Sequence, residues 1–405
     1  MIAHARSAYI HIPFCRRRCY YCDFPISVIG DGGGTLNRIQ AMEQYVTVLC
    51  REIRLTAQAF PSSGLSTVFF GGGTPSLLPI SELEKILVTL DQIYTLSQDA
   101  EISIEIDPKT FDLNQLKAYQ RLGINRYSLG VQAFQDQLLS QIGRTHQVED
   151  IYSAIAQFEE LGIDNFSFDL ISGLPQQTLT QWETTLDQAI ALSPPHLSCY
   201  DLIIEPGTAF ERHREHRKLS LPTDETSAQM YRLTQQILTA AGYTHYEISN
   251  YAYPNYQCRH NRVYWQNQSY YGFGMGAASF LRGQRLTRPR TRREYAHWVE
   301  TLGDPNHELY QKINDHPDDQ LLEQLMLGLR LPEGVDLSAI AQQFGSKKVQ
   351  QIIKSLQPDF DQNWVTLENI NHNPWGRLQL TDPEGLLFSN TILARLFSAF
   401  SDENR

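Results

Sequence analysis

Three cysteines stand close together near the start of the chain, at Cys15, Cys19 and Cys22. They directly follow a short β-rich run, so one tight loop offers three thiolates. Three thiolates can hold three irons of a cubane [4Fe–4S] cluster and leave the fourth iron open to a substrate or cofactor. A zinc ion completed by His11 or by a distant residue is the alternative, but structural zinc usually takes a closed set of four ligands in paired spacing. The loop therefore predicts a metal centre, and its spacing favours the cluster.

The elements that must position this loop alternate regularly up to about residue 240. Strands are expected at residues 8–12, 66–70, 102–106, 126–129, 165–170 and 197–204, and helices at residues 36–60, 80–94, 113–122, 151–161 and 179–192. Repeated strand and helix units predict an α/β fold with a parallel sheet and right-handed crossovers. Six such units favour an incomplete (β/α)6 barrel over a complete eight-fold one.

Polar or glycine-rich residues come at the ends of several of these strands. The second strand runs into residues 71–76, which read GGGTPS, the third ends at Glu105 and Asp107, the fourth at Gln132 and the fifth at Asp169. Ligands of such folds bind at the carboxyl ends of the strands, which meet at one edge of the sheet. We therefore expect these residues to share one rim with the cysteine loop.

The composition is that of a globular chain without a nucleic-acid signature. Hydrophobic residues make up 41% and charged residues 20% of the 405 residues, which suits a packed core. The net charge of -11 opposes broad binding to a phosphate backbone, so nucleic acid is not an expected partner. The N-terminus lacks the apolar core of a signal peptide, and no apolar run reaches the roughly 18 residues of a membrane span. A cytoplasmic protein is expected.

The regular alternation fades after residue 215. A helix at residues 227–240, a strand at 243–248 and an aromatic-rich stretch at 251–280 come next. Helices at residues 318–329, 337–344 and 348–356, two strand-like runs and a last helix ending near residue 397 then predict a small winged-helix-like domain. We expect a barrel domain over residues 1–300 and this C-terminal domain over 301–405. DNA binding is not favoured, because the domain lacks a basic recognition helix. Residues 30–34 predict a surface loop.

Taken in order, these motifs resemble the radical S-adenosylmethionine superfamily, whose CxxxCxxC loop binds such a cluster. The runs YIHIPFC at residues 9–15 and GGGTP at residues 71–75 narrow the resemblance to the group of oxygen-independent coproporphyrinogen III oxidases and their heme-chaperone relatives. The resemblance implies a [4Fe–4S] cluster on Cys15, Cys19 and Cys22, with S-adenosylmethionine bound beside it.

The resemblance also implies which residues hold S-adenosylmethionine. Glycine backbone can approach the methionyl amine closely because no side chain blocks it. Taken singly, each polar residue has an ordinary explanation, such as a strand-end cap or a solvated carboxylate, and only their convergence on one rim favours the cofactor site. The residues that match family positions are Tyr9, Tyr21, Gly73, Thr74, Glu105, Gln132, Arg144 and Asp169.

Three features separate the two branches of this group. The oxidases carry a fourth cysteine two positions after the third, where this chain has Phe24, and they have an N-terminal extension that is not seen here. Residues 260–265 read HNRVYW, an HNxxYW motif that the resemblance assigns to the heme-chaperone branch. His260 offers an axial nitrogen to heme iron, and Cys258 offers a thiolate instead. The same residues could equally serve packing and hydrogen bonding.

The segment at residues 272–279, GFGMGAAS, resembles the glycine-rich segment that lies near the adenine in the family. Relatives often have a histidine where this chain has Ala278, so that histidine's role is not carried over. Met275 is expected to pack rather than to bind iron.

The expected function is a heme chaperone that binds the cluster, S-adenosylmethionine and heme and delivers heme to hemoproteins, membrane-bound respiratory enzymes among them. A coproporphyrinogen III oxidase is the alternative, and a structural zinc protein with a protein-binding winged-helix domain is the third hypothesis. The resemblance further suggests a homodimer. Cleavage of S-adenosylmethionine, catalytic residues and the recipient hemoprotein stay open.

Overall fold

The structure is a computed structural model that describes residues 4–30, 35–62, 64–216, 219–304, 306–311, 316–368 and 374–400. Most of the loop expected at residues 30–34 lies outside the described residues, since only residue 30 is included. Among the described residues, no helix is both long and apolar enough to cross a membrane.

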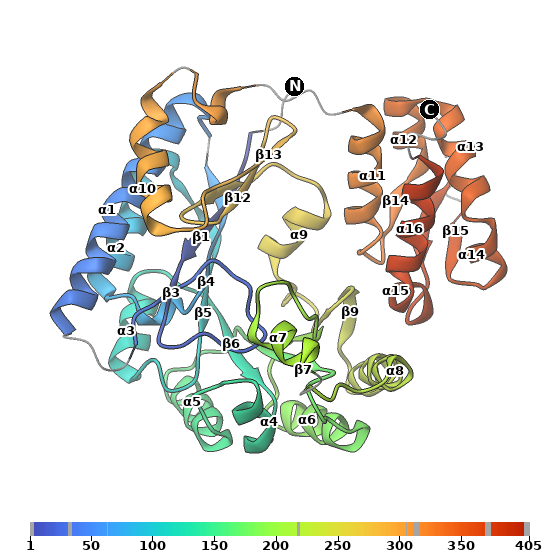
Figure 1. The fold of residues 1–405 in the computed structure, drawn as a ribbon. Helices are drawn as coiled ribbons and strands as arrows, with labels where there is room; N and C mark the ends of the chain where they lie inside the picture. The colour runs from blue at the N-terminus through green and yellow to red at the C-terminus, as the bar shows by residue number, and fades with distance from the viewer. Residues whose placement is uncertain are drawn as a thin grey trace.

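A nine-stranded sheet with the order β11-β1-β4-β5-β6-β7-β8-β10-β9 forms the centre of the molecule (Figure 1). Its six central strands are parallel neighbours: β1 (Ser7–Ile12), β4 (Leu65–Gly72), β5 (Leu96–Ile106), β6 (Arg126–Gln132), β7 (Phe166–Ser172) and β8 (His196–Asp201). The end strands β9 (Thr244–Glu247) and β11 (Tyr271–Phe273) do not pair with each other. The predicted incomplete (β/α)6 barrel is therefore confirmed.

The strands at the two ends of the sheet were not all expected. β11 joins β1 in parallel, whereas β10 (Asn250–Ala252) pairs antiparallel with β8 and forms a hairpin with β9. One expected strand was too long, because β8 ends at Asp201 and residues 202–205 are no longer part of a strand, although the Leu202 N–H still donates to the carbonyl of Ser172. Residues 202–204 are apolar like the strand before them, so the sequence pattern continues beyond the point where the strand ends.

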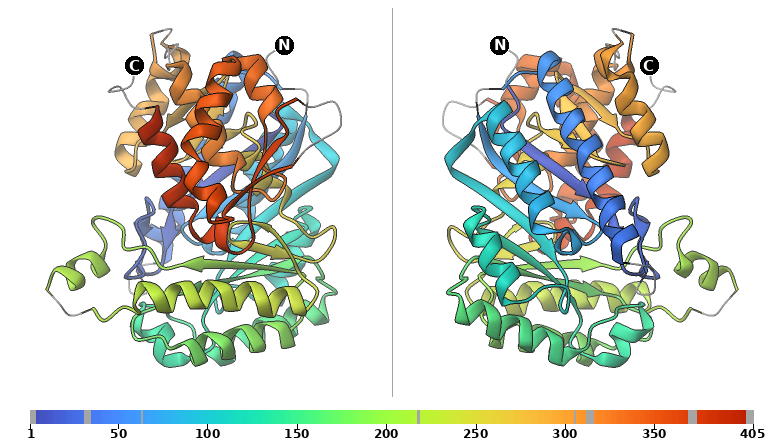
Figure 2. Two further views of the ribbon diagram at one scale, coloured as in Figure 1. Left: turned by 90° about the vertical axis from the view of Figure 1, so that its right-hand side faces the viewer. Right: turned by 90° about the vertical axis from the view of Figure 1, so that its left-hand side faces the viewer.

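Helices cover the outer face of the sheet (Figure 2). The longer ones turn an apolar stripe inward, as in α2, where Leu83, Ile86 and Leu90 are buried. The helices that follow the strands are α1 (Thr35–Ala59), α2 (Ile80–Tyr94), α3 (Leu113–Arg121), α4 (Asp136–Gln141), α5 (Val148–Glu160), α6 (Leu179–Ala191), α7 (Ala209–Glu215) and α8 (Asp224–Ala240).

Shorter elements complete the barrel. β2 (Phe14–Cys15) and β3 (Ser27–Val28) pair with each other and close the cysteine loop. After β10 come α9 (Arg259–Trp265), the hairpin of β12 (Ala278–Leu281) and β13 (Gln284–Thr287), and α10 (Arg292–Glu300), which packs along α1.

The C-terminal part has its own buried core and lies beside α9 and the β9 edge (Figure 1). Its strands form a three-stranded antiparallel sheet in the order β14-β16-β15, flanked by helices, which is the winged-helix-like arrangement that was expected. Its elements are α11 (Pro317–Gly328), β14 (Val335–Asp336), α12 (Leu337–Phe344), α13 (Ser346–Ser355), α14 (Gln357–Asp361), β15 (Val365–Glu368), β16 (Arg377–Leu380), α15 (Glu384–Leu387) and α16 (Ser389–Ala399).

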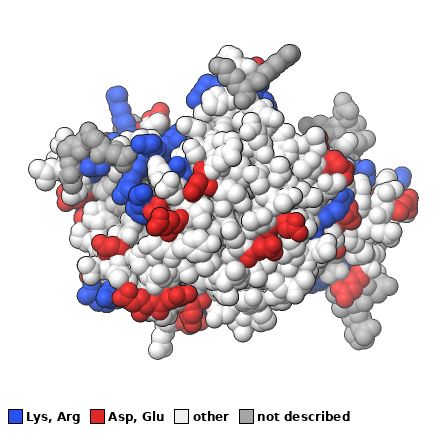
Figure 3. Space-filling view, turned by 90° about the horizontal axis from the view of Figure 1, so that it is seen from below, with Lys and Arg blue, Asp and Glu red and all other residues white. Residues whose placement is uncertain are grey.

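The surface charge is divided into small patches. Seen from below, acidic and basic side chains lie in small groups, several of them next to each other, around a largely uncharged centre (Figure 3). Among the residues coloured in that view, no broad basic surface is visible. This face therefore does not offer the continuous positive surface that a nucleic-acid backbone requires.

Candidate functional site

The cysteine loop is held as a closed loop at the carboxyl end of β1. The backbone N–H of Ser27 donates to the carbonyl of Pro13 at 2.6 Å, and that of Ile29 donates to the carbonyl of Cys15 at 2.9 Å. Cys15, Cys19 and Cys22 all line one cavity of about 380 Å³. The loop predicted to hold a metal therefore presents its three thiols to one space.

Nearby donors and burial suit sulfur ligands of a cluster. The Thr74 hydroxyl lies 3.7 Å from the Cys15 sulfur, and the Arg144 guanidinium lies 3.8 Å from that of Cys19. Burial raises the pKa of the Cys15 thiol to about 12 and that of the Cys22 thiol to about 11, so these thiols keep their protons until iron replaces them. No group of three His, Cys, Asp or Glu side chains within the described ranges is arranged to hold a single metal ion. The three thiols share one cavity, which suits three ligands of a cubane whose fourth iron stays open.

The glycine-rich end of β4 approaches this loop too closely for any side chain. A Cβ on Gly73 would lie 2.7 Å from the carbonyl oxygen of Phe14 and 3.0 Å from the Cys15 sulfur. Gly72 has a φ of +114°, and its Cβ would meet the His11 ring at 2.4 Å. The backbone of β4 therefore forms one wall of the cavity, as the glycine run predicted.

Two partly buried carboxyls line the floor of the cavity. Glu105 accepts a 2.9 Å hydrogen bond from the Gly72 N–H, and burial raises the pKa of its carboxyl to about 8. Asp169 accepts from the Ser128 hydroxyl at 2.9 Å, and burial raises the pKa of Asp169 to about 6. A cationic ligand would restore both carboxylates to their charged form. S-adenosylmethionine carries an ammonium and a sulfonium charge, so this floor suits it.

A buried arginine links the floor to the cysteine loop. Arg144 forms an ion pair with Asp107 and donates to the carbonyl of Gly130 at 2.9 Å. The hydroxyl of Thr74 donates to the second oxygen of Asp107 at 3.2 Å. Arg144 thus offsets the negative charge of Asp107, and it lies close enough to the Cys19 sulfur to offset the charge of a thiolate there as well.

The structure brings together nearly all the residues expected at the cofactor site. The residues of that set that line the cavity are Cys15, Cys19, Cys22, Tyr21, Gly73, Thr74, Glu105, Gln132, Arg144 and Asp169. Tyr9 is the exception, because it lies beside the floor rather than in the wall. A Cβ on Gly71 would lie 2.9 Å from Glu105 and 3.0 Å from the Tyr9 ring, which places the two side chains next to each other.

Sequence reasoning missed the residues at the mouth of the cavity. The lining also includes Phe24, Ile26, Tyr200, Leu202 and Ile203. Three of these belong to the end of the expected strand at residues 197–204, and a strand assignment there hid their role. Only the structure shows that β8 ends early and that the residues after it line the cavity.

His260 lies in a different place and already uses both ring nitrogens. Nδ1 lies 2.7 Å from the Thr67 hydroxyl and Nε2 lies 2.8 Å from the Tyr264 hydroxyl. The side chain is fully buried, the ring stacks on Phe69, and burial lowers its pKa to about 3. Binding heme iron would require one of these bonds to break, so this geometry does not favour the expected axial ligation.

Cys258, the other ligand considered for heme, is buried in the same region. Its sulfur lies 3.7 Å from a carboxylate oxygen of Glu101, which also accepts the backbone N–H groups of Arg259 and His260 at 3.0 and 2.9 Å. Glu101 therefore caps the first turn of α9, and burial raises the pKa of Cys258 to about 12. These contacts indicate a structural role for Cys258, because its thiol is buried and is not open to heme iron.

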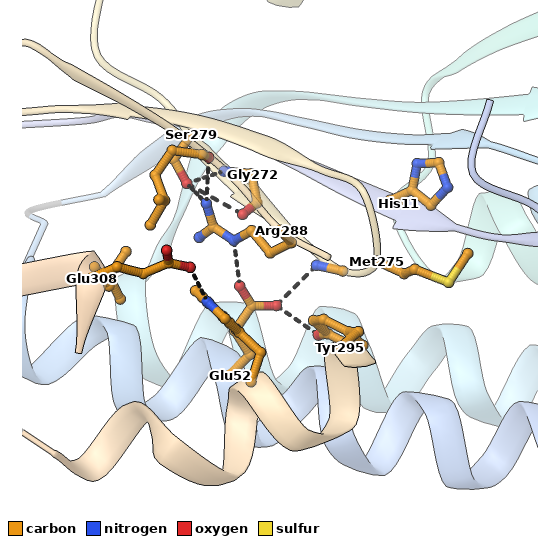
Figure 4. Close-up of polar contacts among 12 residues, drawn as sticks. His11, Glu52, Gly272, Met275, Ser279, Arg288, Tyr295 and Glu308 are labelled. Atoms are coloured by element: carbon orange, nitrogen blue, oxygen red, sulfur yellow. Dashed lines mark hydrogen bonds and ion pairs between the residues drawn. The ribbon is translucent and has the colours of Figure 1, made fainter. Parts of the chain in front are cut away.

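The glycine-rich segment after β11 is fixed by a buried ion pair (Figure 4). Glu52 accepts from the Arg288 Nε at 2.8 Å, from the Gly274 N–H at 2.9 Å and from the Tyr295 hydroxyl at 2.6 Å. Both charged side chains are fully buried. A Cβ on Gly276 would lie 2.0 Å from Pro25, so the segment presses against the residues that follow the cysteine loop. The sequence did not predict a role for Glu52 or Arg288, because each lies among other charged residues that are typical of a protein surface.

Comparisons with known proteins agree with this geometry. Residues 9–189 match the Radical SAM superfamily and residues 315–387 match the HemN C-terminal domain. The chain is 47% identical to the heme chaperone HemW of Synechocystis sp. over 98% of this chain and 97% of that protein. It is 33% identical to the heme chaperone HemW of Bacillus subtilis over 98% of this chain and all of that protein. Coproporphyrinogen III oxidase (HemN) from Escherichia coli is similar in structure, with a TM-score of 0.79, 25% identity and coverage of 97% of this chain and 90% of the other.

Proposed function

The chain belongs to the HemW family of the radical S-adenosylmethionine superfamily, and from this membership we propose that it is a heme chaperone, which binds heme and delivers it to hemoproteins. We propose further that Cys15, Cys19 and Cys22 hold the [4Fe–4S] cluster. A cubane on these thiolates leaves one iron for the amino and carboxylate groups of S-adenosylmethionine.

One observation carries the cofactor part of the proposal: the three thiols, the glycine end of β4 and two partly buried carboxyls face the same cavity. In that arrangement the backbone of Gly73 and Thr74 would hold the methionyl amine, and Glu105 and Gln132 would contact the methionyl and ribose parts. Asp169 would be a further residue of the cofactor site. Arg144 holds Asp107 in place. Cluster and cofactor together supply one-electron chemistry when both are bound.

An oxygen-independent coproporphyrinogen III oxidase is the second candidate, and the likeness to HemN favours keeping it. Phe24 speaks against it, because it occupies the position where the resemblance places a fourth cysteine in the oxidases. The near full-length similarity to HemW proteins at up to 47% identity also favours the chaperone.

Four narrower statements belong to the same proposal. The recipients are hemoproteins such as membrane-bound respiratory enzymes, and the chaperone acts in the cytoplasm as a homodimer. The barrel domain takes residues 1–300 and the C-terminal domain residues 301–405. Fusion of each range to a reporter, or limited proteolysis, would locate the boundary.

A paired assay on one anaerobically reconstituted sample tests the function. Heme is titrated by absorbance, and the sample is then incubated with coproporphyrinogen III, S-adenosylmethionine and a reductant, with porphyrins separated by chromatography. Saturable heme binding without decarboxylated product supports the chaperone. Turnover to protoporphyrinogen would replace it with the oxidase.

A further inference from the structure

Two unusually exposed apolar side chains line the cofactor cavity, and their exposure places them at its mouth. Phe24 belongs to the cysteine loop and is 58% exposed, and Ile203 follows β8 and is 66% exposed. Apart from Leu36, no large hydrophobic side chain among the described residues is more exposed than these two. Exposed apolar side chains at the opening of a cavity are typical of a binding site, since solvent exposure there has no packing benefit.

The cavity changes in character from its floor to its mouth. The floor is polar, with Glu105, Asp169 and the cluster cysteines. The mouth gains apolar surface from Ile26 and Leu202 in addition to Phe24 and Ile203. A ligand at the mouth would therefore meet apolar side chains from two segments, 24–26 and 202–203, that are far apart in the sequence.

Charges at the mouth are also unequal on its sides. Arg17 and Asp23 from the cysteine loop line the cavity, so their charges balance on that side, whereas Asp201 and Glu205 make the side after β8 acidic. A flat apolar ligand with anionic groups on one edge would turn that edge toward Arg17 and away from the two carboxyls. Heme has this chemistry, because its two propionates lie on one edge of a flat apolar ring.

We propose that heme binds at this mouth, with its ring between Phe24 and Ile203 and its propionates toward Arg17. This inference rests on the proposed function, since it locates the heme that a chaperone must carry. Of the described side chains that line the cavity, none is a His or a Met. Affinity then comes from the apolar faces and the propionates.

The site is distinct from the HNxxYW segment. His260 is fully buried with both ring nitrogens engaged, and it is absent from the lining of the cavity. Heme at the mouth predicts that substitutions at Phe24 and Ile203 weaken heme binding. Heme on His260 predicts that only a substitution at His260 does so.

The test is a hemin titration, followed by absorbance, of the full chain loaded anaerobically with its cluster. Phe24→Ser and Ile203→Ser each remove apolar surface from one lip, and each is expected to weaken hemin binding about tenfold. Arg17→Gln is expected to weaken it about threefold, with loss of part of its salt dependence. Iron content and S-adenosylmethionine binding check that the cluster loop is intact, and Ile203→Ser changes a residue remote in sequence from the cysteines.

Phe397→Ser is the matched control, because Phe397 is an exposed phenylalanine on α16 in the C-terminal part. It should leave the hemin affinity unchanged. If the parent chain binds hemin while both lip variants bind it equally well, the mouth is not the site. If only His260→Gln abolishes binding, the motif is the ligand and the inference is wrong. If the parent itself binds no hemin, the proposed function fails first.

Discussion

Glu105 shows how single residues tune the cavity. Its carboxyl is partly buried in the floor, so its pKa rises to about 8 in the absence of a cation. A carboxyl with a raised pKa in the folded protein stabilises the fold below its ordinary pKa and loses that contribution as the pH rises toward 8. A cationic ligand reverses this balance, because it favours the carboxylate.

We therefore predict that S-adenosylmethionine binds more tightly as the pH rises from 6.5 to 8.5 and releases protons near pH 7. Glu105→Gln should weaken binding about tenfold, or ~1.4 kcal/mol, and remove much of the pH dependence. Calorimetry in two buffers of different ionisation enthalpy measures the proton release. Equal affinity and equal proton release in parent and variant would contradict this role of Glu105.

His260 is predicted to stabilise the barrel rather than to bind iron. Its ring bridges Thr67 of β4 and Tyr264 of α9 and stacks on Phe69. His260→Gln should lower the free energy of unfolding by about 2 kcal/mol, since buried hydrogen bonds are lost. Chemical denaturation measures this, with His297→Gln on the surface of α10 as control. A stability equal to that of the parent would refute the structural role.

At the level of elements, aromatic rings connect α9 with the cavity. Tyr9 lies against Phe69, Phe69 stacks on His260, and His260 contacts Tyr264, with ring centroids 6.3, 5.4 and 5.2 Å apart. α9 thus braces the interior faces of β1 and β4, whose carboxyl ends carry the cysteine loop and the glycine wall. His260 and Tyr264 of the HNxxYW motif thus support the strands that carry the cofactor site, without lining its cavity.

The buried pair Glu52–Arg288 supports the same site from the other side. It ties α1 and α10 to the glycine segment that presses on Pro25. Glu52→Gln should destabilise the fold by about 3–5 kcal/mol, because it leaves Arg288 charged and buried without its partner. Glu84→Gln, on the exposed face of α2, is the control. A loss no larger than that of the control in urea unfolding would show that the pair contributes little.

The regular elements could be predicted from the sequence, but the unusual pairings could not. The expected helix at residues 80–94 and the one at 337–344 match α2 and α12, because a strong apolar period sets their length. β11 pairs with β1 over a separation of more than 250 residues, and no local pattern carries that information. The polar residues at the strand ends could be placed together because strand ends converge, whereas Tyr21 and Arg144 came only from the resemblance. Residues 202–203 were predicted to be strand, which concealed their place at the mouth.

At the scale of the whole molecule, two cores lie side by side and polar contacts join them. Arg232 forms a two-point ion pair with Glu384 at 2.6 and 2.9 Å, and Arg262 of α9 pairs with Glu333 at 2.6 Å. Exposed ion pairs of this kind contribute little stability each. The fold class and the two-part organisation followed from the alternation of strands and helices, whereas the packing of α9 between the two parts required the structure.

The most direct test of the account is a hemin titration of the anaerobically reconstituted parent chain, followed by absorbance. The account predicts saturable binding of heme in a fixed ratio to the chain, with the cluster absorbance near roughly 400 nm retained. Hemin association that never saturates would indicate nonspecific adsorption and would contradict the heme-chaperone function.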